Sequence, residues 1–213
     1  MRIMRKIIFL FGISVLLFTG CAKPYDNFSS YVFNPENEHG RQMKSKYIDS
    51  LYSAYKEINQ RNIPLQQPGL GFTSGQRCGD LCNNEPGDFW FYVVSPHEKP
   101  VSSGRYKSIN RRAYEVFRKK VPDIIHALKY APSEKLIKDE HFEGIIIGTT
   151  WPVYNSIGEY LNPKKYEEGD IFIPFDLLGK YVKYEIYMTD LLCGSYVFAS
   201  VAEKEPQHVD ICR

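Results

Sequence analysis

Two uninterrupted runs of aromatic and β-branched residues constrain the fold most strongly. Residues 88–95 read DFWFYVVS between Gly87 and Pro96, and residues 144–150 read GIIIGTT. Short apolar runs bounded by turn residues are typical of buried strands. The chain therefore needs a sheet whose interior these two strands occupy.

Two amphipathic helices are predicted to cover such a sheet. The first spans residues 42–62 and ends at Ile63-Pro64, because the residue before a proline is driven out of the helical region. The second begins at an N-cap, Ser108. Pro122 lies within this second helix and either kinks it or starts a new one. The apolar positions recur at helical spacing: Tyr47, Leu51, Tyr55 and Ile58 in the first helix, and Ala113, Phe117, Val121, Ile124 and Leu128 in the second.

The C-terminal third is predicted to be mainly β. Residues 170–174 form a short strand, residues 181–188 alternate apolar with polar side chains, and residues 196–202 are their expected hairpin partner. Residues 65–87 read as an irregular connector. Helices that precede adjacent strands predict an α+β fold, with two main helices packed on a largely antiparallel sheet. The 213 residues suit one such domain, expected at residues 36–213, with Trp90 and Trp151 in its core.

The N-terminal segment has the pattern of a targeting signal. Arg2, Arg5 and Lys6 precede twelve apolar residues, 7–18. As a helix this run is about 18 Å long, shorter than the roughly 30 Å of a bilayer core, so it is typical of a signal peptide. Residues 17–21 (LFTGC) resemble the lipobox of bacterial lipoproteins. Alternatives left open are an ordinary secretory peptide and an uncleaved anchor.

The lipoprotein resemblance implies a lipid-anchored envelope protein. Residues 1–20 would be removed, Cys21 would carry the acyl chains (palmitate among them), and residues 21–35 would form a tether. Ala22 after the cysteine implies sorting to the outer membrane, with the domain facing the periplasm or the cell surface. Several acyl chains give stable attachment, whereas one holds only marginally. Without the three basic residues of the signal, 24 basic residues face 25 acidic residues, and the net charge changes from +2 to −1.

Four cysteines remain in the mature chain, namely Cys78, Cys82, Cys193 and Cys212. An oxidising compartment favours structural disulfides, and four cysteines allow three connectivities. A redox pair is the first alternative, but the spacing of Cys78 and Cys82 departs from the two-residue redox motif. A zinc site is the second, but Cys193 and Cys212 are too far apart in sequence for a close ligand pair.

Common catalytic signatures are missing from the sequence: it has no Gly-x-Ser-x-Gly, no phosphate-binding loop and no His-Glu-x-x-His. The best acid–base or metal candidates are His141 and Glu143, which would point the same way on an extended segment. Further ligands for a metal are not evident. We therefore expect neither a metal nor a cofactor. A binding role is expected in preference to catalysis.

A basic segment offers an anion-binding patch. Between residues 105 and 120 seven basic residues stand against the one acidic residue Glu115. Such a concentration attracts anionic surfaces over roughly 8 Å at physiological ionic strength. The alternative is a solvated helix face neutralised by the acidic stretch 134–143. The patch comprises Arg105, Lys107, Arg111, Arg112, Arg118, Lys119 and Lys120.

These features predict a membrane-anchored envelope lipoprotein that acts as a binding or assembly component. Its expected partners are the membrane, anionic lipid, lipopolysaccharide or an envelope protein. Nucleic acid is not an expected partner of an exported protein. One alternative is a periplasmic hydrolase or metal-dependent enzyme that uses His141 and Glu143. Another is a purely structural surface lipoprotein. Tyr181, Tyr184 and Tyr187 form a tyrosine-rich set that suits either a partner platform or a core edge.

Overall fold

A computed structural model describes residues 27–35, 38–74, 89–129, 142–201 and 204–212. The chain divides into two units, residues 1–30 and 31–213. In the first unit, the Ser30 hydroxyl donates to the Asn27 carbonyl oxygen at 2.8 Å, where the 3₁₀ helix η1 (Phe28–Tyr31) begins.

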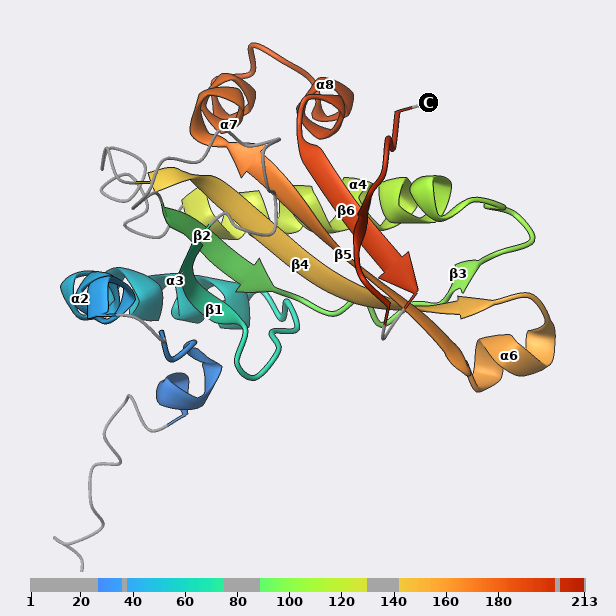
Figure 1. The fold of residues 1–213 in the computed structure, drawn as a ribbon, viewed down its shortest axis with the longest axis horizontal. Helices are drawn as coiled ribbons and strands as arrows, with labels where there is room; N and C mark the ends of the chain where they lie inside the picture. The colour runs from blue at the N-terminus through green and yellow to red at the C-terminus, as the bar shows by residue number, and fades with distance from the viewer. Residues whose placement is uncertain (1–26, 36–37, 75–88, 130–141, 202–203, 213) are drawn as a thin grey trace, which may run out of the picture. The chain divides into compact units, whose positions relative to one another are not determined.

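A mixed sheet organises the second unit (Figure 1). Within the described residues it has seven strands in the order β1-β2-β4-β5-β6-β7, with β3 beside β4. Only β2 and β3 run parallel to β4; the other neighbours are antiparallel. The predicted α+β class with a largely antiparallel sheet is confirmed. The bounds are β1 Leu70–Ser74, β2 Phe89–Val94, β3 Val101–Ser102, β4 Phe142–Tyr154, β5 Lys165–Pro174, β6 Tyr196–Val201 and β7 Gln207–His208.

The described helices are α2 Glu38–Lys46, α3 Ile48–Gln60, α4 Ile109–Lys129, α6 Ile157–Leu161, α7 Phe175–Val182 and α8 Met188–Cys193. The first predicted helix is two, α2 and α3, because Tyr47 leaves the helical region at their junction. The second is confirmed as α4, which runs through Pro122 as one element. Ser108 caps it by accepting the Arg111 N–H at 3.3 Å.

Two sequence-based assignments were wrong. Residues 181–188 are not a strand: they end α7, form a turn and begin α8, so β6 pairs with β5 instead. None of the side chains that the alternation placed inward, at positions 182, 184, 186 and 188, is buried. The connector 65–87 contains strand β1, which pairs with β2 and continues the sheet. At β1, pairing with a distant strand overrode the local pattern. At residues 181–188, the ends of two helices produced an alternation that resembles a strand.

The core lies on both faces of the sheet. On the face covered by α4, Trp151 packs edge-on against Phe117 of α4, with ring centroids 6.4 Å apart. Side chains alternate along β4, so Ile146 lies on the opposite face, in a buried cluster with Trp90 and Phe172. The expectation that both tryptophans are core residues is confirmed.

A disulfide joins Cys193, at the end of α8, to Cys212, with an S–S distance of 2.01 Å. It realises one of the three possible connectivities and confirms a disulfide-containing domain. Cys78, Cys82 and the predicted lipidation site Cys21 lie outside the described residues. Among the described helices, none combines the length and the hydropathy that a transmembrane span requires.

Candidate functional site

The candidate site is organised around Lys120, which α4 turns toward the interior. Its ammonium donates a hydrogen bond to the Ser95 hydroxyl oxygen at 3.0 Å. The Ser95 hydroxyl in turn donates to the Pro64 carbonyl oxygen at 2.6 Å. Ser95 follows β2 and Pro64 follows α3, so this chain of hydrogen bonds ties together three elements that are distant in sequence.

Lys120 is a buried cation without an ionic partner in the described part of the chain. Only 8% of the residue is exposed, and no described carboxylate lies within 4 Å of its ammonium nitrogen. Burial lowers the Lys120 pKa below its usual value of 10.5, although the negative charges of Asp123 and Glu98 partly oppose this. Buried charges are normally paired, because removing an ion from water is costly. The environment of Lys120 is therefore incomplete for a purely structural lysine.

Arg112, on the same helix, is a buried cation that does have an ionic partner. Its guanidinium donates to both carboxylate oxygens of Glu167, at 2.9 and 2.6 Å. The Trp151 indole N–H donates to the same carboxylate at 2.9 Å, and the Arg112 guanidinium also donates to the backbone carbonyl oxygens of Tyr106 and Lys107. Arg112 is thus compensated by a bidentate ion pair, whereas within the described residues Lys120 has one neutral hydroxyl as its partner.

Lys120 lies in the wall of a pocket of about 590 Å³. The end of α3, the middle of α4 and the end of α7 surround it. Arg61 and His126 add basic groups, and Asp123 is the only carboxylate among the described lining residues. Pockets of this volume suit small organic ligands. The lining residues are Arg61, Asn62, Ile63, Pro64, Lys120, Pro122, Asp123, Ile125, His126, Tyr181, Val182 and Tyr184.

Two helix C-termini meet at this pocket with the same backbone turn. Asn62 after α3 has a φ of 53° and Tyr184 after α7 has a φ of 61°. In each case the next residue closes the turn: the Ile63 N–H donates to the Ile58 carbonyl oxygen at 3.1 Å, and the Glu185 N–H donates to the Lys180 carbonyl oxygen at 2.9 Å. This is the Schellman pattern, in which glycine is the usual residue and asparagine is tolerated. Tyrosine in the left-handed region costs roughly 1–2 kcal/mol.

The pKa of His97 reflects its burial and the positive charges around Lys120. It is buried, and its pKa falls from 6.5 to about 4, first because of burial and then because of the positive charges of Lys120, Lys119 and Lys99. The imidazole is therefore neutral at pH 7. The surroundings of Lys120 are electropositive on this side as well.

The predicted basic patch divides into two groups. Arg112 and Lys120 are buried and are not available to a surface ligand. The other five side chains are exposed, and Arg118 pairs with Glu115 at 2.5 Å. The exposed members, for which anion binding stays a prediction, are Arg105, Lys107, Arg111, Arg118 and Lys119.

The acid–base candidates are not brought together in the described structure. Glu143 lies half-buried near the start of β4 and is not among the described residues that line the Lys120 pocket; His141 lies outside the described residues. No group of three metal-ligating side chains occurs in the described part of the chain. Of the tyrosine-rich set, Tyr181 and Tyr184 line the pocket.

Sequence reasoning missed Arg61, Ser95 and His126, which only the fold brings to one place. The burial of Lys120, in contrast, has a sequence signal. Lys120 follows Phe117 by three positions and precedes Ile124 by four, so it lies on the apolar stripe of the helix. A lysine on such a stripe is either paired in the core or faces a ligand.

Comparisons of the chain with protein-family models, with curated proteins and with solved structures found no match.

Proposed function

We propose that this protein is a lipid-anchored envelope lipoprotein that binds a small organic anion in the Lys120 pocket. The observation that carries the proposal is that Lys120, a buried residue with no described carboxylate within 4 Å of its ammonium, lines a pocket of about 590 Å³. A carboxylate or phosphate group of a ligand supplies the charge that this ammonium lacks.

The pocket walls favour an anion with an apolar body. The Arg61 and His126 side chains add hydrogen-bond donors. Ile63, Val182 and Tyr181 line other parts of the pocket with apolar surface, which is suited to an aliphatic or aromatic group. Charged and polar side chains share the lining with apolar ones, which suits a ligand that has both an anionic group and an apolar part.

Anchorage is supported by the sequence of residues 1–24. The basic start, the apolar run and the lipobox-like residues 17–21 support the proposal that Cys21 is lipidated and forms the mature N-terminus. The segment that follows Cys21 then keeps the binding domain at the membrane, which raises its local concentration there. The exposed cations of α4 add long-range attraction for anionic lipid or lipopolysaccharide.

The proposal is tested by titration calorimetry of the purified full chain with benzoate and with phenyl phosphate. We expect one of the two to bind, and Lys120→Gln to weaken that binding by about tenfold or more, because it removes the buried counter-charge. Lys119→Gln is the matched control: it removes an exposed lysine next in sequence and should leave the affinity unchanged. If neither anion binds, or if both variants lose affinity equally, the anion pocket is overturned.

A further inference from the structure

A second surface, around helix α6, carries large apolar side chains that are exposed to solvent. Helix α6 places Ile157, Tyr160 and Leu161 at spacings of three and four residues, which lie on one helix face. Ile157 is 83% exposed and Leu161 is 77% exposed; Tyr160 and, beyond the helix, Tyr166 are about half exposed. Exposed apolar clusters of this kind mark interaction surfaces.

Local hydrogen bonds hold these side chains outward. The Ser156 hydroxyl oxygen caps α6 by accepting the Glu159 N–H at 3.3 Å, and the Glu159 carboxylate accepts the Asn155 N–H at 2.9 Å. The Tyr160 ring packs edge-on against the Tyr154 ring, with centroids 5.1 Å apart. The apolar face of α6 is therefore presented by a capped, ring-packed helix.

A hollow of about 500 Å³ adjoins the helix. Tyr160, Leu161 and Tyr166 contribute to its lining, together with Pro100 and Pro152. The hollow and the exposed helix face share two of these side chains, so they form one continuous surface. We name this surface the α6 surface.

Basic side chains flank the α6 surface. Lys164 and Lys165 follow the helix directly and are exposed. The Ser103 N–H donates to the Tyr154 carbonyl oxygen, with an N···O distance of 2.8 Å. This hydrogen bond brings the loop that contains the exposed Arg105 next to the end of β4, which leads into α6. Of the acidic neighbours, Glu98 is exposed and the Glu159 carboxylate is engaged in the α6 cap. Apolar side chains with a basic rim complement an anionic, partly apolar partner.

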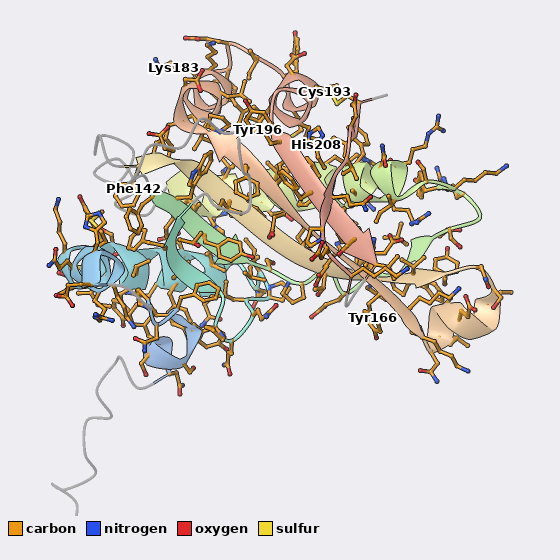
Figure 2. The ribbon with its side chains drawn as sticks, viewed as in Figure 1. Phe142, Tyr166, Lys183, Cys193, Tyr196 and His208 are labelled. Atoms are coloured by element: carbon orange, nitrogen blue, oxygen red, sulfur yellow. A yellow bond between two sulfur atoms is a disulfide. The ribbon has the colours of Figure 1, made fainter. Side chains whose placement is uncertain are left out.

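The α6 surface lies at one end of the sheet and α7 with α8 at the other (Figure 1). Strand β5 connects the two ends: Tyr166 lies at the α6 end, and Lys183 follows α7 at the other end (Figure 2). Ten residues of strand span roughly 33 Å. The α7–α8 end exposes Tyr184 and Tyr187 and therefore provides a control surface for experiments.

We propose that the α6 surface docks into the headgroup region of an anionic bilayer. Aliphatic side chains, tyrosines and lysines together are the composition of protein surfaces that lie in the membrane interface. Ile157 and Leu161 enter the acyl boundary, Tyr160 and Tyr166 lie at headgroup level, and Lys164 and Lys165 contact lipid phosphates. The inference rests on the proposed anchorage for its proximity to a membrane and is independent of the Lys120 pocket.

The test uses the full chain reconstituted into vesicles of phosphatidylcholine with phosphatidylglycerol. Ile157→Trp places a fluorescent probe on the α6 surface, and Tyr187→Trp places one at the α7–α8 end; the buried Trp90 and Trp151 give the same background in both. We expect the emission of Ile157→Trp to shift to shorter wavelength and to lose intensity when brominated lipids replace normal ones. Tyr187→Trp should show neither change.

Two further arms identify what the surface contacts. Lys164→Gln combined with Lys165→Gln, or vesicles without phosphatidylglycerol, should reduce the quenching of Ile157→Trp by brominated lipid. If this tryptophan stays open to aqueous iodide in anionic vesicles, bilayer docking is overturned, and crosslinking of the same position to an envelope protein would assign the surface to a protein partner. Benzoate and phenyl phosphate titration of Ile157→Asp separates the two proposals, because the Lys120 pocket should be unaffected.

Discussion

At the scale of single residues, the two buried cations of α4 differ in the groups that compensate their charge. Arg112 has a bidentate carboxylate partner, Glu167, whereas Lys120 has the hydroxyl of Ser95. Removing one member of a buried ion pair leaves the other charge uncompensated, so pairs such as Arg112 and Glu167 hold a fold together. Lys120 has no such partner among the described residues, and a buried cation of this kind is better explained by a ligand than by stability.

The stability of the protein should depend on His97 in acid. Its folded pKa of about 4 lies below the 6.5 of an unfolded histidine, so the unfolded chain binds the proton more readily. The contribution of His97 is complete above pH 6.5 and is lost as the pH falls from 6.5 to about 4, by on the order of 3 kcal/mol. Urea unfolding at several pH values should show a smaller loss over this window in His97→Gln than in the unsubstituted chain.

A direct measurement of the His97 pKa supplies the control. Lys120→Gln removes one of the positive charges that lower this pKa, so the His97 resonance in NMR should titrate at a higher pH in that variant than in the unsubstituted chain. A His97 that titrates near 6.5 in the unsubstituted folded protein contradicts the burial and charge argument.

At the scale of elements, the ends of α3 and α7 define the pocket. Both helices stop with a residue in the left-handed region, Asn62 and Tyr184, and the chain reverses there. The alternation of residues 181–188 predicted a strand because side-chain periodicity says nothing about where a helix is capped. The continuation of the apolar stripe through Lys120 was readable, since it depends only on spacing within α4.

Tyr184→Gly should stabilise the protein by about 1 kcal/mol. Glycine adopts the left-handed turn without the clash that a Cβ causes, and the 86% exposed Tyr184 ring loses little packing. Urea unfolding at neutral pH measures the change. Tyr184→Ala is the matched control: it removes the same ring but keeps the Cβ in the left-handed turn, so it should not give this gain in stability. Equal effects of the two substitutions would refute the assignment of strain to Tyr184.

At the scale of the whole molecule, β5 separates the α6 surface from the α7–α8 end, where Tyr184 lines the Lys120 pocket. The proposed bilayer contact at one end leaves the other end free of the membrane. The Cys193–Cys212 disulfide ties α8 to the C-terminus at that second end. With this pair formed and Cys21 acylated as proposed, Cys78 and Cys82 are each other's remaining partners in a fully oxidised chain.

Intact mass spectrometry of the protein isolated from membranes tests processing and pairing together. We expect the mass of residues 21–213 with added acyl groups, reduced by two hydrogens for each of two disulfides. Non-reducing peptide mapping should then join Cys193 to Cys212 and Cys78 to Cys82. A mass that retains residues 1–20, or a chain that carries four free thiols, contradicts the processing or the oxidation, respectively. Cys21→Ser should abolish the acyl mass and leave both pairs intact.

Sequence by itself determined the features that depend on neighbouring residues. The strand β2, the helix that begins after Ser108 and the α+β class follow from apolar spacing and capping, which act within a few residues. The resemblance of residues 17–21 to a lipobox likewise needs no fold.

The tertiary structure alone decided which groups share an environment. Pro64, Ser95 and Lys120 meet only when α3, β2 and α4 pack together, and the cysteine pairing depends on where α8 ends. Pairing with β2 likewise made β1 from a stretch without a strand pattern. The physical reason is that secondary structure responds to local spacing, whereas burial and compensation of a charge depend on elements far apart in the chain.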